Sequence, residues 1–153
     1  MRVTGRYRDA PLLEFIGRAD AVSDLVGEKL ADSFVADALQ RVAHSDAFCT
    51  LLPLPAPVGP ATYYVLTDDA NPVLAQALEN ELQKAFRYRE ARWLGQLASV
   101  TAISHPRMRN WVHEAIEATG VKSGDIKDRA LITRPELARQ IYGHVVARYR
   151  DAT

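Results

Sequence analysis

The segment GRADAVSDLVGEKL, residues 17–30, gathers charged side chains that can bind anions and hydroxyl groups. Arg18 offers a planar guanidinium suited to phosphate, carboxylate or vicinal hydroxyls, and Lys29 offers a point charge. Asp20 offers acceptor oxygens, and Gly17 lets the backbone bend or approach a ligand closely. The alternative is that Arg18 pairs with a nearby carboxylate on a solvated loop, since such surface pairs are common and weak.

A second polar segment, RYREARWLGQ at residues 87–96, alternates arginines with aromatic residues. This pattern can stack on bases and neutralise the phosphates of a single-stranded nucleic acid. The whole chain has 19 basic and 19 acidic residues, so its net charge does not favour nucleic acid as a partner. We therefore interpret the segment as a surface linker with Tyr88 and Trp93 packed inward.

A third polar segment, VKSGDIKDRALI at residues 121–132, lies between two predicted helices. Lys127 follows Gly124 and Asp125 there. A lysine on a glycine-containing loop can move onto the negative charge that develops in acyl or phosphoryl transfer. A solvated lysine without such a role is the alternative.

Several kinds of site have no support in the sequence. The histidines lack ligand-like spacing with each other or with the single cysteine, Cys49, so we expect no metal site. Neither phosphate-loop motif, G-x-x-x-x-G-K-[ST] or G-x-G-x-x-G, is present, and G-x-S-x-G is also absent. One cysteine and no apolar leader fit a reducing compartment, and we expect the protein to be cytoplasmic.

Residues 47–67 contain no charged side chain, a length that raises the possibility of a membrane helix. Four prolines and Gly59 fall inside this stretch and would break such a helix repeatedly. We interpret 48–54 and 61–67 as two strands joined by a stiff connection, and expect no membrane span.

The remaining periodicities predict helices that alternate with short strands. The recurrence of Leu74, Leu78, Leu82 and Phe86 every four residues places one helix on a core. In chain order, we expect a strand at 12–16, a helix from Asp32, the strand pair, a helix opening at Asn71 and Pro72, a strand at 97–103, a helix from Pro106 and a last helix capped by Thr133. This order predicts an α+β fold with one small mixed sheet and helices packed on it.

Three segments together resemble a known family. They are YRDAPLLEFIGRADAVSDLVGEKL (7–30), YREARWLGQL (88–97) and GDIK (124–127), in that order. They are similar to the C-terminal part of the auxin-responsive promoter family, the acyl acid–amido synthetases and their bacterial relatives, within the acyl-adenylate-forming superfamily. The resemblance spans nearly the whole chain, and its first segment is the most specific.

The resemblance implies roles for single residues. Gly17, Arg18 and Asp20 match a G-R-x-D signature at the junction of two domains, with Asp20 as the hinge and Gly17 and Arg18 facing the nucleotide. Lys29 resembles a lysine that the family points toward the active site. Lys127 lies in the loop before the last helix, where the superfamily carries its adenylation lysine, although the local pattern departs from the usual one.

The resemblance also implies that residues 1–153 form a single C-terminal lid domain, with its hinge at about 17–30. The large N-terminal domain that would hold ATP, Mg²⁺ and the carboxylic acid is not in this sequence. We expect the lid to assist an ATP-dependent ligase that joins an acid to an amine, and to be inactive alone with no tightly bound cofactor. The alternative is a stand-alone α+β binding or interaction module without catalysis.

Overall fold

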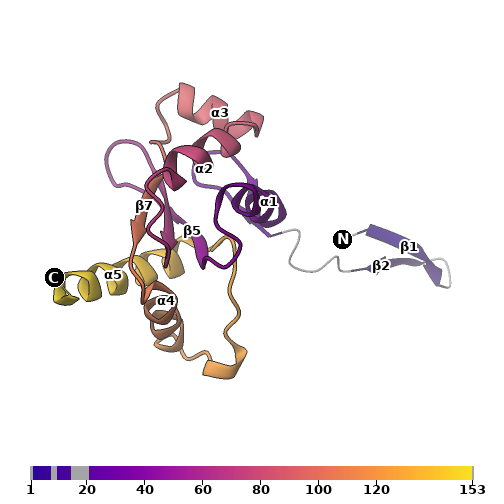
Figure 1. The fold of residues 1–153 in the computed structure, drawn as a ribbon. Coiled ribbons are helices and arrows are strands. Elements are labelled where there is room, and N and C mark those ends of the chain that lie inside the picture. Colours follow the sequence, from indigo (N-terminus) through magenta and orange to yellow (C-terminus); the bar gives the residue numbers. More distant parts are fainter. Residues whose placement is uncertain (1, 8–9, 15–20, 153) are drawn as a thin grey trace.

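A computed structural model describes residues 2–7, 10–14 and 21–152, with side chains described from Ala21 onward. Figure 1 shows the chain as a body of helices and strands preceded by a hairpin. In chain order the elements are β1 (Arg2–Tyr7), β2 (Ala10–Glu14), β3 (Val22–Ser23), β4 (Leu30–Ala31), α1 (Asp32–Val42), β5 (Cys49–Leu54), β6 (Thr62–Thr67), α2 (Leu74–Leu82), α3 (Phe86–Trp93), β7 (Thr101–Ser104), α4 (Met108–Glu117), the short 3-10 turn η2 (Ser123–Asp125) and α5 (Pro135–Ala152).

The central sheet has the strand order β5-β6-β7 and is mixed. β5 and β6 are antiparallel, with Cys49 opposite Thr67 and Leu54 opposite Thr62, which confirms the predicted strand pair. β6 and β7 are parallel, so the chain crosses over through α2 and α3 between them. Leu131 adds an isolated parallel bridge to Leu51 on the outer edge of β5, which brings the late 121–132 segment onto the sheet.

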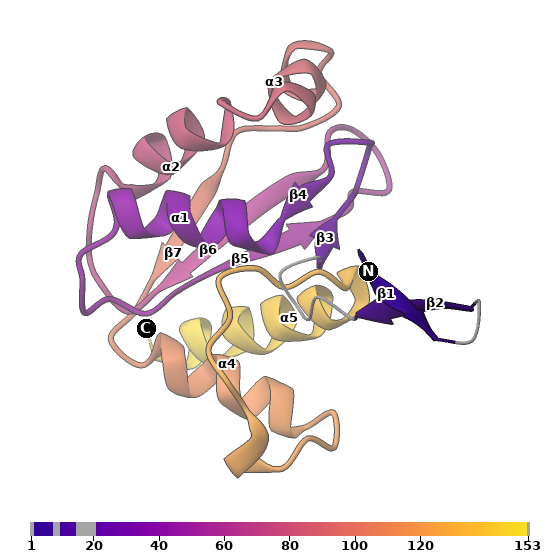
Figure 2. The same ribbon diagram turned by 90° about the vertical axis from the view of Figure 1, so that its right-hand side faces the viewer.

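Helices cover both faces of this sheet (Figure 2). Successive residues of β5 divide between two cores, because side chains alternate along a strand. Leu51 packs in a cluster with α1 and α2, and Leu52 packs in a cluster with α4 and α5. The two clusters make an α+β sandwich, and this architecture confirms the predicted fold class.

Two smaller sheets lie earlier in the chain. β1 and β2 form one antiparallel hairpin, and β3 and β4 form another. The predicted strand at 12–16 overlaps β2, but its end falls outside the described residues. β4 leads directly into α1, which begins at Asp32 as the sequence predicts and buries Val35, Ala38 and Leu39.

The helix predicted through Phe86 is interrupted. Leu74, Leu78 and Leu82 are buried as expected, but α2 ends at Leu82 and α3 starts at Phe86. Ala85 has an extended backbone, φ −79° and ψ 119°, so the chain changes direction there. The Phe86 side chain is consequently 64% exposed, and its predicted place on the core is wrong.

Smaller differences concern element ends. β7 begins at Thr101, while Leu97 contributes only an isolated bridge to Ala61. α2 begins at Leu74 because Asn71 accepts the amide of Val73 in a turn that precedes the helix. The last helix begins at Pro135, whose fixed φ suits a first helical position.

Candidate functional site

The first candidate segment is described only in part. Gly17, Arg18 and Asp20 lie outside the described residues. From Ala21 the chain forms β3, then a turn over residues 24–29, then β4. The turn decides where Lys29 lies.

Glu28 fixes this turn from inside the protein. Its side chain is 2% exposed, and its carboxylate accepts the amides of Leu25 and Val26, both at 2.8 Å. The Tyr63 hydroxyl on β6 donates to the same carboxylate. Burial, then the charge of Glu28, raises the pKa of Tyr63 far above its ordinary value, so the phenol keeps the proton that it donates.

Lys29 is held in an unusual backbone conformation. Its φ is +48°, the single positive value for a non-glycine residue in the described part of the chain. Such a conformation costs about 1–2 kcal/mol for an L-residue. Gly27 precedes it with φ +103°, and its amide donates to Asp24 Oδ1 at 2.7 Å. The turn therefore buries Glu28 and leaves the Lys29 side chain exposed.

Sequence reasoning missed the structural role of Glu28. It considered this residue only as a possible partner of Arg18 on a solvated loop. The available signal was the alternation of small apolar and polar residues in 21–30, which is too short to show which carboxylate is buried.

The loop that carries Lys127 is bound to strand β5 by two backbone hydrogen bonds just after this lysine. The Ala130 carbonyl accepts the Leu51 amide at 2.8 Å, and the Ile132 amide donates to the Leu51 carbonyl at 3.0 Å. Earlier in the same loop, the Asp128 carboxylate lies 2.7 Å from His113 Nε2 and forms an ion pair with the Arg109 guanidinium, and both partners come from α4. Lys127 is exposed immediately before this braced residue.

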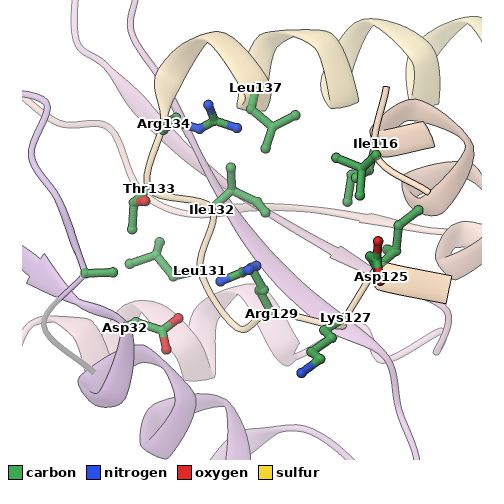
Figure 3. A pocket seen from close by; sticks show the side chains of 13 residues that line it. Asp32, Ile116, Asp125, Lys127, Arg129, Leu131, Ile132, Thr133, Arg134 and Leu137 are labelled. Atoms are coloured by element: carbon green, nitrogen blue, oxygen red, sulfur yellow. The ribbon is translucent and has the colours of Figure 1, made fainter. Parts of the chain in front are cut away.

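A cavity of about 270 Å³ lies beside the loop, at the start of α5. Lys127, Arg129 and Arg134 line it, and no ion pair joins these three cations to another described residue. Figure 3 shows them with Asp32, whose carboxylate comes from the first turn of α1. Unpaired cations around a hollow can bind an anionic group.

The cavity joins two of the three candidate segments. Ala21 and Asp32, which flank the 22–31 segment, line it together with the Lys127 loop. Gly124 and Asp125 form the 3-10 turn, and Asp125 also lines the cavity. Lys29 does not line this cavity, so the structure does not bring the two candidate lysines to one pocket.

The third candidate segment, 87–96, is mainly the helix α3 and not a linker. Tyr88 is buried as expected, but Trp93 is 84% exposed, so its predicted inward packing is wrong. The reason is Glu79 on α2, a 4% exposed carboxylate that sequence reasoning missed. It accepts Arg92 Nε at 2.6 Å and the Tyr88 hydroxyl at 2.7 Å, which fixes the inward face of α3.

Glu79 is charged in spite of its burial. Burial is the largest single effect and raises the carboxyl pKa, but hydrogen bonds from Arg92, Gln83, the Val100 amide and Tyr88 together lower the pKa below its ordinary value. This cluster therefore holds α3 against α2.

Two further kinds of feature are absent from residues 2–7, 10–14 and 21–152, a metal-ligand cluster and a membrane-spanning helix. No group of three or more His, Cys, Asp or Glu side chains there is arranged to hold a metal ion. None of the helices in those ranges has the length and apolar character needed to cross a membrane.

Among known proteins, this chain has similar solved structures but no matching sequence family. No family model matches the sequence, and no curated protein matches it. The fold is similar to a solved structure described as GH3.15 acyl acid amido synthetase, with a TM-score of 0.60 and 15% identity over 93% of this chain. It is also similar to AtGH3.15 acyl acid amido synthetase in complex with 2,4-DB, with a TM-score of 0.58 and 15% identity over 94% of this chain. This chain spans about 29% of the length of each enzyme.

Proposed function

We propose that this chain is the mobile C-terminal lid domain of an ATP-dependent ligase that forms an acyl-adenylate and then an amide. The similarity of nearly its whole fold to about 29% of an acyl acid amido synthetase carries the proposal. The family-like segments at 7–30, 88–97 and 124–127 support it from the sequence. The proposed lid comprises residues 1–153, with its hinge at about 17–30.

Lys127 is the residue we propose for the adenylation step. Its side chain is exposed, has no carboxylate partner among the described residues and stands on a loop braced by Asp128. An ammonium group in that position fits a phosphate oxygen. It would stabilise the negative charge that builds up when a carboxylate attacks phosphorus.

Lys29 and the hinge residues have separate proposed roles. The positive φ at Lys29, held by the buried Glu28, presents a cation on a rigid turn close to the hinge. Strained backbone of this kind is often found at functional sites. We propose Asp20 as the hinge and Gly17 and Arg18 as the residues facing the nucleotide, on the family resemblance.

A lid domain acts together with a second domain, and this determines the partners that we propose. We assign ATP, Mg²⁺ and the carboxylic acid to a large adenylation domain, and the acyl acceptor is an amine. Most contacts to the reacting atoms would lie on that domain, so the lid alone would have little activity. We place the enzyme in the cytoplasm.

The test is ATP–pyrophosphate exchange by the enzyme that carries this domain, measured with a panel of carboxylic acids. The intact enzyme should exchange pyrophosphate with at least one acid, and deletion of residues 1–153 should abolish exchange while ATP still binds. Full exchange after the deletion would contradict the lid role. If no acid supports exchange by the intact protein, the binding-module alternative is favoured.

A further inference from the structure

Helix α3 carries an aromatic groove to which the proposed function assigns no role. Phe86, Arg89, Glu90 and Trp93 line it, with a volume of about 380 Å³. Trp93 is 84% exposed and Phe86 64% exposed, and Leu94 beside them is 55% exposed. Large apolar side chains exposed together on one helix are a common feature of interaction surfaces.

The groove is a fixed feature of the surface. The opposite side of α3 is locked to α2 because Tyr88 and Arg92 both bind the buried Glu79 carboxylate. α3 therefore cannot rotate to bury its aromatic side. The Arg89 guanidinium lies 5.7 Å from the centre of the Phe86 ring, a cation–π contact. Figure 1 shows α3 at one end of the body, where a second molecule has access.

Along the helix the four groove residues are aromatic, basic, acidic and aromatic, so the reversed order places opposite charges level with each other. Phe86 and Trp93 are seven residues apart, two helical turns or about 10 Å. When two copies of α3 lie antiparallel about a two-fold axis between Arg89 and Glu90, Phe86 of one copy is level with Trp93 of the other. Arg89 of each copy is level with Glu90 of the other, and the central charges sum to zero.

We propose that α3 is a self-association surface on which a second copy of this protein docks antiparallel. A two-fold interface must be complementary to itself, and the order of charges along this helix has that property. Arg89 and Glu90 have no ion pair with another described residue, so both are available to a second copy. A single short helix offers a small contact area, so we expect a weak dimer.

The first test is sedimentation velocity of the full protein from about 1 μM to 0.5 mM. The wild type should shift from monomer to dimer, and Trp93→Ser should raise the dissociation constant at least about tenfold. Val58→Ser is the matched control, because Val58 is 90% exposed but lies on the connection between β5 and β6. A monomeric wild type, or a Trp93→Ser variant that still dimerises normally, would overturn the proposal.

A charge-reversal experiment tests the antiparallel arrangement. Arg89→Glu places four carboxylates at the proposed axis, and Glu90→Arg places four guanidinium groups there. Each variant alone should dimerise at least about tenfold more weakly than the wild type, and mixing the two should restore association as a heterodimer. A mixture that associates no better than either variant alone would refute this pairing.

Discussion

At the residue scale, two buried glutamates have different structural roles. Glu79 meets a guanidinium, a phenol, an amide side chain and a backbone amide, so its charge is stabilised inside the protein. Glu28 is bound by Tyr63 and two backbone amides, and it holds the turn that carries Lys29. One carboxylate joins two helices, and the other joins a turn to the sheet.

We predict that Glu79→Gln destabilises the protein by about 2 kcal/mol, because a charged hydrogen-bond acceptor is lost from a buried site. The lowered pKa of Glu79 also sets a pH dependence. Its stabilisation is fully present above the ordinary glutamate pKa of about 4.3 and is lost as pH falls through the lower folded pKa. Urea unfolding at pH 7 and at lower pH measures both effects.

Glu117→Gln is the control for this variant, since Glu117 is exposed at the end of α4. It should leave the free energy of unfolding nearly unchanged. If Glu79→Gln is as stable as the Glu117→Gln variant at neutral pH, the Glu79 cluster has no stabilising role.

At the scale of elements, the loop between α4 and α5 has a first half with few contacts and a second half bound to the sheet. Residues 130–132 are bound to β5, while residues 121–127 are held by few contacts beyond the 3-10 turn. Between these two halves, the Asp128 carboxylate joins the loop to Arg109 and His113, which are four residues apart on α4. This brace defines the place from which Lys127 extends.

We predict that Asp128→Asn loosens this loop without weakening the fold. Amide hydrogen exchange over residues 122–129 should quicken about fivefold, which corresponds to about 1 kcal/mol of lost local stability. Exchange in the sheet should not change, because the backbone bridge at Leu51 remains. Asp125→Asn is the control, and equal acceleration in both variants would show that Asp128 is not a brace.

The sequence predicted elements where periodicity is long or proline and cap residues are clear, as in α1, α4 and the β5–β6 pair. It failed at α3, where the apolar recurrence ran on through Phe86 although the chain turns at Ala85. That turn depends on Glu79 binding Arg92 and Tyr88, which are 13 and 9 residues away along the chain. A local pattern does not contain such a contact.

For the whole molecule, the sheet separates two helical layers, and the proposed Lys127 site lies where both layers meet. The cavity is lined by Asp32 from α1 on one side and by Leu137 from α5 on the other. Sequence reasoning selected this loop, with two others, as a candidate by its polar composition. It could not place Arg129 and Arg134 beside Lys127, because their proximity arises from the Leu51–Leu131 bridge and the start of α5.

We propose that Lys127 acts in adenylation when this domain closes on its partner domain. The most direct measurement is ATP–pyrophosphate exchange by the full-length Lys127→Ala enzyme, with Lys122→Ala as the control from the same exposed loop. We predict that Lys127→Ala lowers the exchange rate about 100-fold or more. The same variant should transfer a preformed acyl-adenylate to an amine almost normally. Unchanged exchange in Lys127→Ala, or an equal loss in Lys122→Ala, would contradict the claim.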